Sequence, residues 1–386
     1  MKNEGVLLIL CSFQCVEGYS IKQKAQLHAN LSSGYDRMIR PGLNQTVPTI
    51  ININFYLTSL EEFAMEKSKM TVMGSFGLEW TDSRLTWNST NFDGDLNQTS
   101  LFVSNIWAPY FILFNPHHEQ MPILSGEQSC NVYANGKIVC LPSDRFVVIC
   151  SNSIDFYPFD TQNCTLRFYV PGYLASDIVF QSLSPTIQMD YFEENGQWFV
   201  RDTKNYINRN IFNGIKVEVL QLEVIMQRRS KYYVFSFLLP TIYINFLQIF
   251  VFILPADSNE RVGFSIGVLL CVVIFLTIIL DKLPVSPDVS KFMTKLLWDM
   301  VFGSLIVLAV VLTSRIYHKE DAVKVPMFMK KILRIKEENT AVHPKKITKS
   351  LDKIFLIAFT TAIVLNISLY FIRCKLAGAN LSYFSY

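Results

Sequence analysis

The stretch from Pro255 to Pro284 carries residues whose types and spacing suit the movement of ions across a membrane. An uncharged run, residues 262–280, has close to the roughly 20 apolar residues that a membrane-spanning helix needs. One face of this helix, reached by alternating steps of three and four residues, has an acid at each end, glycines, bulky apolar residues and a threonine. Its members are Glu260, Gly263, Gly267, Leu270, Ile274, Thr277 and Asp281.

Rings of acidic side chains select cations, and apolar constrictions close a pore by dewetting. The face therefore predicts a cation pore, which only an oligomer can enclose because one helix cannot surround a channel. An ordinary membrane anchor is the alternative, although an anchor has no need for an acid at both ends of one stripe.

The composition points to a membrane protein. Half of the 386 residues are hydrophobic and only 17% are charged, which is rich for a soluble protein. The net charge of +3 is too small to indicate a nucleic-acid partner. The sequence shows no phosphate-binding glycine loop, nucleophile motif or paired metal motif, so we expect neither enzymatic activity nor a cofactor.

The first 18 residues resemble a signal peptide, with Lys2 before the apolar run 6–10 and Gly18 at a cleavage point. The following segment is then extracellular. Glycosylation sequons agree with this assignment, and they begin at Asn30, Asn44, Asn88, Asn97 and Asn163, with a further one at Asn380 near the carboxyl end.

Residues 19–231 read as an extracellular all-β domain. In residues 51–57 apolar and polar side chains alternate, as in a half-buried strand. In residues 215–224 the alternation changes phase, which predicts a bulge. Asn135–Gly136 is a strong hairpin signal.

The polar region contains an even set of cysteines, Cys130, Cys140, Cys150 and Cys164. Such a set in a secreted region implies disulfides, with three possible connectivities. A tight turn at the hairpin would place Cys130 opposite Cys140, so we favour the pairs Cys130–Cys140 and Cys150–Cys164.

Four hydrophobic spans follow, at residues 232–254, 262–280, 292–314 and 351–373. Pro240 is expected to kink the first. The loop 315–350 is basic, so the excess of Lys and Arg places it in the cytosol. Both termini then lie outside, and residues 374–386 form an extracellular tail.

Several motifs together resemble one family. Thirteen residues separate Cys150 from Cys164 and contain Phe-Tyr-Pro-Phe-Asp; the others are residues 80–87 (WTDSRLTW), 107–109 (WAP) and 254–258 (LPADS). They occur in the order of the Cys-loop receptors, the pentameric ligand-gated ion channels, and are most similar to the cation-selective branch of nicotinic, serotonin and zinc-activated channels.

The resemblance implies an extracellular β-sandwich followed by a four-helix transmembrane domain, assembled as a homopentamer or heteropentamer in the plasma membrane. An unknown small-molecule agonist would bind between extracellular domains and open a pore for cations. Glu260 matches the inner acidic ring, Leu270 the hydrophobic gate and Asp281 the outer ring. Gly263 and Gly267 depart from the family pattern, which has small polar residues there.

The resemblance also implies a charged cluster where the two domains meet. Asp160 ends the Phe-Pro-Phe-Asp segment, Glu62 falls in the first inter-strand loop, and Arg229 precedes the first span. Pro284 lies in the loop after the pore helix, which this cluster would contact. We expect these residues to couple agonist binding to gating.

Amine-binding relatives use an aromatic box, because cations are attracted to aromatic faces. Phe114 keeps one aromatic position, whereas Pro171 and Ser75 replace two others. The short capping loop offers Tyr206 and Phe212. With the box largely dismantled, we expect that acetylcholine is not the agonist.

Two alternatives stay open. The chain could be a non-conducting accessory subunit that needs partners, or a channel opened by metal or protons. His117–His118 is the only feature that suggests the second alternative. Adjacent histidines rarely reach one ion together, so we expect no metal site.

Overall fold

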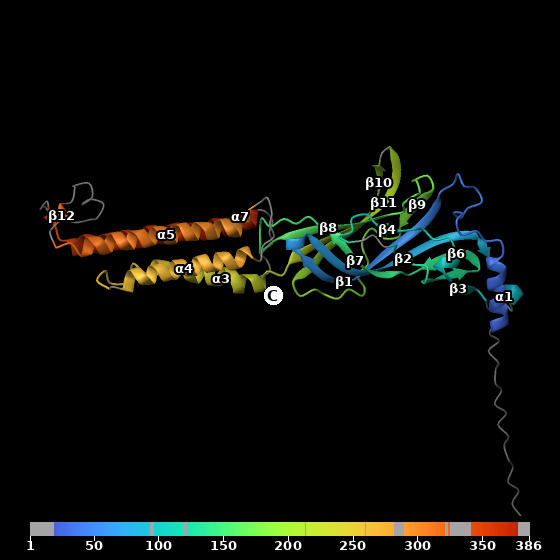
Figure 1. Ribbon diagram of the computed structural model, residues 1–386, viewed down its shortest axis with the longest axis horizontal. Coiled ribbons are helices and arrows are strands. Elements are labelled where there is room, and N and C mark those ends of the chain that lie inside the picture. Colours follow the sequence, from blue (N-terminus) through green and yellow to red (C-terminus); the bar gives the residue numbers. More distant parts are fainter. Residues whose placement is uncertain are drawn as a thin grey trace, which may run out of the picture.

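The computed structural model describes residues 19–92, 96–118, 122–212, 214–258, 260–281, 289–320, 323–324 and 341–376. A β-rich part and a bundle of long helices lie end to end (Figure 1). Helix α1 (Ile21–Ser32) caps the far end of the β-rich part. Ser20 precedes α1 and forms a capping box with Gln23. The Ser20 side chain accepts from the backbone N–H of Gln23, and the Gln23 side chain accepts from the backbone N–H of Ser20.

Two sheets form a sandwich. One contains β1 (Thr49–Ala64), β2 (Lys69–Thr86), β3 (Gln98–Phe102), β5 (Ser129–Tyr133), β6 (Asn135–Cys140), β7 (Ser143–Ile149) and β9 (Ile178–Ser182). The other has the order β10 (Trp198–Phe212), β11 (Ile215–Arg228), β8 (Thr161–Tyr169) and β4 (Ile112–Leu113). Short 3₁₀ turns occupy Met65–Lys67, Ser89–Phe92 and Val103–Asn105. The expected all-β sandwich is confirmed.

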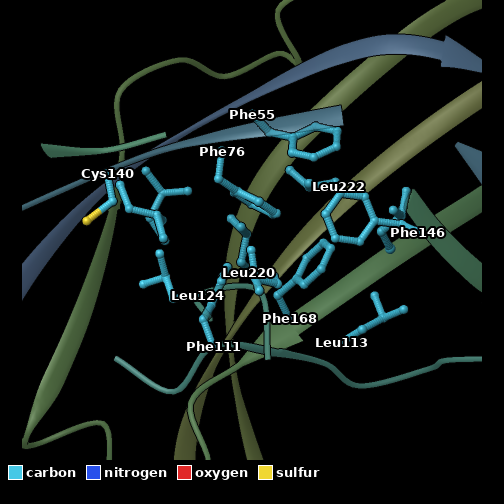
Figure 2. Close-up of a cluster of buried hydrophobic side chains, with 14 of the residues drawn as sticks. Phe55, Phe76, Phe111, Leu113, Leu124, Cys140, Phe146, Phe168, Leu220 and Leu222 are labelled. Atoms are coloured by element: carbon cyan, nitrogen blue, oxygen red, sulfur yellow. The ribbon is translucent and has the colours of Figure 1, made fainter. Parts of the chain in front are cut away.

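Aromatic side chains from both sheets fill the space between them (Figure 2). Phe76 of β2 makes edge-to-face contacts with Phe168 of β8 and with Phe111, at centroid distances of 4.9 and 5.4 Å. Such pairs stabilise a core beyond the area that they bury. The expected alternation in residues 51–57 is confirmed, because Ile51, Ile53, Phe55 and Leu57 are all buried.

Gly74 of β2 makes room for this core. A Cβ atom there would lie 2.4 Å from the ring of Phe55 on the neighbouring strand. The ring and any larger side chain at position 74 would therefore exclude each other.

The predicted bulge in residues 215–224 is wrong. The β10–β11 register runs without interruption from Phe212↔Ile215 to Asp202↔Ile225, and its irregularity lies between Val200 and Asp202. The phase change that suggested a bulge arises because Glu218 is buried on the inward face. There it accepts from the backbone N–H of Phe180 and pairs with Arg209 at 3.0 Å, which satisfies the carboxylate away from water.

Both expected disulfides are present. Cys130 and Cys140 join β5 to β6, with Cα atoms 4.5 Å apart. Cys150 and Cys164 close a loop with Cα atoms 5.3 Å apart. Gly136 adopts φ +78° in the hairpin between the first two cysteines, which is a conformation that glycine takes without strain.

Four helices in the described part of the chain are long and apolar enough to span a membrane, as expected. The first comprises α2 (Lys231–Tyr233), a π-helical turn η4 (Val234–Leu238) and α3 (Leu239–Phe250). The others are α4 (Glu260–Leu280), α5 (Lys291–Tyr317) and α7 (Pro344–Leu376). The π-helical turn ends two residues before Pro240, the residue expected to distort this span. A short ladder, β12 (Val323–Lys324) with β13 (Ala341–Val342), precedes α7.

A polar group lies inside the helix bundle. Lys295 and Asp299 of α5 form an ion pair at 2.5 Å and both are buried. Lys295 also contacts the hydroxyl of Thr241 on α3, and Asn366 of α7 donates to Asp299 at 2.9 Å. Charged groups buried in a membrane domain require such partners, so these contacts tie α3, α5 and α7 together.

The predicted glycosylation sites within the described residues, Asn30, Asn44, Asn88, Asn97 and Asn163, are all exposed. Their modification stays a prediction. Asn380, the leader 1–18 and Pro284 lie outside the described residues.

Cys150→Ser is expected to reduce the stability and surface assembly of the protein. Loss of a native bridge from a secreted domain typically costs about 2–5 kcal/mol. Surface labelling and size-exclusion chromatography would measure the effect. Cys271→Ser, at a cysteine free of disulfides, is the control. Equal surface assembly of the two variants would contradict the expectation.

Candidate functional site

The predicted pore stripe of α4 lies on one uncovered face of the subunit. Every position in it is exposed: Glu260, Gly263, Gly267, Leu270, Ile274, Thr277 and Asp281. Leu270 and Ile274, the bulky members, are 56% and 57% exposed. Apolar surface of this extent on a spanning helix needs lipid, another subunit or a pore beside it.

The opposite face of α4 packs inside the subunit. Its buried residues are Arg261, Ser265, Val268, Val272, Leu276 and Ile279. Val268 and Val272 pack against Ile244 of α3, and Leu276 and Ile279 belong to a cluster with α5. Packing within the subunit therefore orients α4 so that the stripe points away from α3 and α5.

Neither stripe glycine serves packing within the subunit. A Cβ atom at Gly263 or Gly267 would meet nothing within 4 Å. By contrast, a Cβ at Gly303 of α5 would lie 2.6 Å from the side chain of Gln248. The two stripe glycines leave bare backbone on the uncovered face.

A buried ion pair lies where the sandwich meets the helices. Arg228, the last residue of β11, binds Asp160 through two hydrogen bonds of 2.7 and 3.0 Å. Both residues are buried. Gln162 donates to the same carboxylate at 2.7 Å. Two nitrogens of the Arg228 guanidinium donate to the two carboxylate oxygens of Asp160, which is the bidentate geometry of strong arginine–carboxylate pairs.

Aromatic rings surround the Arg228 guanidinium. Its Cζ atom lies 4.2 Å from the ring centroid of Trp198 and 5.0 Å from those of Tyr157 and Tyr233. Burial by itself lowers the pKa of Arg228, but the attraction of Asp160 outweighs burial and the pKa stands above its usual value. Burial also raises the pKa of Tyr157, so the phenol stays neutral.

The disulfide loop between Cys150 and Cys164 rests directly on the helices. The backbone carbonyl of Tyr157 accepts from the hydroxyl of Tyr370 on α7 at 3.2 Å, and its ring lies 6.2 Å from that of Phe292 on α5. The N–H of Lys291, the first residue of α5, donates to the carbonyl of Asp155 at 2.9 Å. A displacement of this loop would therefore press on the ends of two helices.

Of the residues expected to form the charged cluster, the structure places only Asp160 in this ion pair. Arg229 instead pairs with Glu194 at the surface, so the arginine opposite Asp160 is Arg228. Glu62 pairs with Lys69 at 2.7 Å, and its hydrogen bond to Lys69 lowers the pKa of the carboxyl. The first loop reaches the cluster through Met65, whose sulfur contacts the Arg228 guanidinium.

The strand period contains a signal for Arg228. Leu220, Leu222, Val224 and Met226 are fully buried on the inward face of β11. Because side chains on one face recur every second residue, the same face continues to Arg228, whereas Arg229 points the other way.

The expected ligand-binding residues lie on the second sheet. Phe114 is half-buried and packs edge-on against Tyr169 of β8, with ring centroids 5.5 Å apart. No motif in the sequence indicated this aromatic partner. Tyr206 of β10 is 36% exposed. Phe212 ends β10, and its side chain lies outside the described residues. Pro171 is only half-buried, beyond the end of β8.

The WTDSRLTW motif has a structural setting. Asp82 is fully buried, accepts from the hydroxyl of Tyr35 at 2.8 Å and binds Arg84 at 2.7 Å. The hydroxyl of Tyr35 also accepts from the backbone N–H of Trp107. The motif thereby ties β2 to the segment that carries Phe114.

Within the described residues no group of three or more His, Cys, Asp and Glu side chains is placed to hold a metal ion. The rings of His117 and His118 contact each other at 4.7 Å.

Sequence comparison assigns the two parts of this architecture. A profile described as the neurotransmitter-gated ion-channel ligand binding domain matches residues 24–230, and one described as the neurotransmitter-gated ion-channel transmembrane region matches residues 237–336. The chain belongs to the neurotransmitter-gated ion-channel family. The Cys-loop receptor resemblance is thus confirmed.

Acetylcholine receptor subunits are among its relatives. Neuronal acetylcholine receptor subunit alpha-6 of Mus musculus is 28% identical over 329 residues, covering 83% of this chain and 65% of the relative. Acetylcholine receptor subunit beta of Xenopus laevis is 25% identical over 343 residues, with coverages of 86% and 70%. Neuronal acetylcholine receptor subunit beta-4 of Homo sapiens is 29% identical over 289 residues, with coverages of 75% and 57%. The chain thus spans about two thirds of the alpha-6 relative.

Family membership and the four apolar helices make this chain a multi-pass protein of the plasma membrane. Its amino-terminal β-sandwich lies outside the cell.

The neighbouring arginines offer a matched test of the junction. Arg228→Gln is expected to destabilise the protein strongly, because removing one partner of a buried pair leaves the other charge unpaired, at a cost of about 3–5 kcal/mol. Arg229→Gln removes an exposed pair, worth at most about 1 kcal/mol. Thermal unfolding of the purified protein would compare the two variants. Equal decreases of the unfolding temperature in the two variants would show that the buried pair of Arg228 stabilises the protein no more than the exposed pair of Arg229.

Proposed function

We propose that the chain is a subunit of a pentameric, ligand-gated, cation-selective channel whose pore is lined by the stripe of α4. The observation that supports this most strongly is the orientation of α4. The face that carries Arg261, Val268 and Val272 is buried in the subunit, while Glu260, Leu270 and Asp281 lie on the uncovered face. Pentameric symmetry would turn that face inward.

Charge selection would depend on the acidic ends of the stripe. A ring of Glu260 carboxylates at the narrow cytosolic mouth attracts cations and repels anions. Gly263 follows Glu260 on the stripe and adds no side chain, so the carboxylates dominate that end. Asp281 lies at the outer mouth, where salt screens charges beyond about 8 Å.

The gate would be the ring of Leu270 side chains, with Ile274 one turn further out. Both side chains are large, apolar and uncovered in the subunit. A narrow ring of such side chains excludes water, which stops ions without blocking the pore sterically.

Gating would pass through the buried pair of Asp160 and Arg228. The sandwich and the membrane domain meet there, and the disulfide loop touches α5 and α7 directly. Glu62, Arg229 and Pro284 stay proposals for the rim of this junction. An agonist that displaces the sheet carrying β10 and β11 would move Arg228 with it.

The agonist would bind on the face of the second sheet near Phe114 and Tyr206. Phe212, the last residue of β10, stays a proposal for the same site. The pair formed by Phe114 and Tyr169 supplies one aromatic wall. Pro171 and Ser75 supply no ring, so we infer that acetylcholine is not the agonist. A screen of amines, amino acids, divalent metals and pH, with currents recorded from the chain expressed alone, tests the function. Surface pentamers without current under any condition would favour an accessory subunit.

Glu260→Ala is expected to lower the cation-to-anion permeability ratio, because it removes the carboxylate ring at the narrow mouth. Asp281→Asn, in the wider vestibule, is expected to lower the current and change selectivity less. The shift of reversal potential on dilution of external sodium chloride measures both effects. An unchanged shift in Glu260→Ala would place the selectivity ring elsewhere.

Leu270→Ser is expected to give a standing current without agonist, because a ring of hydroxyls wets the constriction. Leu269→Ser is the control, since Leu269 is adjacent but lies off the stripe. Patch recordings in the absence of agonist make the comparison. If Leu270→Ser channels close as tightly as the wild type, the gate lies at another level, such as Ile274.

A further inference from the structure

The first turn of α4 carries two opposite charges that the structure separates. Glu260 is exposed on the stripe, whereas Arg261, the next residue, is only 1% exposed. Successive residues of a helix point about 100° apart. Rotation about the helix alone does not bury an arginine, because its long side chain can reach back toward water.

Asp352 of α7 holds the Arg261 guanidinium in its buried position. The two nitrogens Nη1 and Nη2 donate to the two carboxylate oxygens of Asp352 at 3.1 and 2.6 Å. The carboxylate is itself mostly buried, with 13% of its side chain exposed. This two-point geometry fixes the direction as well as the position of the guanidinium.

Aromatic rings close the other side of this socket. The Cζ atom of Arg261 lies 5.9 Å from the ring of Phe252, which follows α3. Phe252 stacks on Phe359 and contacts Phe355, both on α7. Helix α7 and the turn after α3 therefore form a pocket, here called the socket, that receives the guanidinium of Arg261 from α4.

We propose that Asp352 is a positioning residue for charge selection, which keeps Arg261 out of the pore mouth and leaves the Glu260 ring unopposed. The proposal rests on the cation selectivity proposed above. If both side chains faced the lumen, each negative charge of the ring would have a positive charge beside it, and the field that attracts cations would largely cancel.

The local sequence leaves Arg261 no alternative partner on this part of α7. Residues 344–353 contain Lys345, Lys346, Lys349 and Lys353 and a single acid, Asp352. An arginine deprived of that acid would be left buried without a counter-charge, which is strongly unfavourable. The guanidinium would then turn to water, and Glu260 in the adjacent mouth offers both water and a carboxylate.

The test compares reversal potentials on dilution of external sodium chloride. Asp352→Asn should lower the cation-to-anion permeability ratio by several-fold. Asp352→Glu, which keeps the charge, should stay close to the wild type. The double variant Arg261→Gln/Asp352→Asn should regain cation selectivity, because it has no arginine to release. Lys353→Gln, at an exposed neighbouring position of α7, controls for a general change of charge.

A wild-type permeability ratio in Asp352→Asn would overturn the proposal, as would an equal loss in Asp352→Asn and the double variant. If Asp352→Asn alone does not reach the surface, graded co-expression with the wild type should give a graded shift of reversal potential. A reversal potential that stays the same at every ratio of Asp352→Asn to wild type would also overturn the proposal.

A second readout does not depend on current and so separates this proposal from the proposed function. Phenylglyoxal modifies accessible arginines, and peptide mass spectrometry can read the extent of modification at Arg261 in protein purified into lipid nanodiscs. Arg261 should be protected in the wild type and labelled several-fold faster in Asp352→Asn. Equal labelling would refute the burial of Arg261 by Asp352. An anion-selective wild type in which Arg261 is still protected would refute the cation selectivity and leave the contact between Arg261 and Asp352 intact.

Discussion

The structure depends most on the buried ion pair between Asp160 and Arg228. Arg228 ends β11, and α2 begins at Lys231. The strand therefore runs into the first membrane helix without a flexible linker, and the pair locks that passage to the disulfide loop. The loop in turn touches α5 and α7. Because a buried guanidinium needs its counter-charge, the two domains cannot separate here without a large loss of stability.

The same principle orders the membrane domain. Two sets of polar contacts join different helices: Arg261 of α4 binds Asp352 of α7, and Asn366 of α7 donates to Asp299 of α5. Each set fixes how a helix is rotated about its axis, a property that apolar side chains specify weakly in lipid. The uncovered stripe of α4 is the consequence, because a helix held by its buried face has only one face left for a pore.

Much of this arrangement could be predicted from residue pattern. The period of residues 260–281 identified the stripe, and the hairpin at Asn135 identified the disulfide pairing. The wrong prediction of a bulge came from a polar residue on a buried face. A charged residue such as Glu218 usually faces solvent, so its position suggested that the inward face changes phase there, although Glu218 is buried on that face. Arg228 and Arg229 are the same residue type at adjacent positions, and only the alternation of β11 places Arg228 on the inward face. The Arg261–Asp352 contact joins residues 91 positions apart, a separation that no local pattern reports.

The pair of Lys295 and Asp299 has a consequence for biogenesis. Both charges lie on α5, four residues apart along the helix. As soon as α5 is helical, each charge has its partner within the same segment, so the desolvation that a lone charge would suffer in lipid is reduced. Asn366 belongs to α7, which is synthesised after α5. We therefore expect the third span to form its ion pair during insertion, before α7 completes the hydrogen bonds of Asp299.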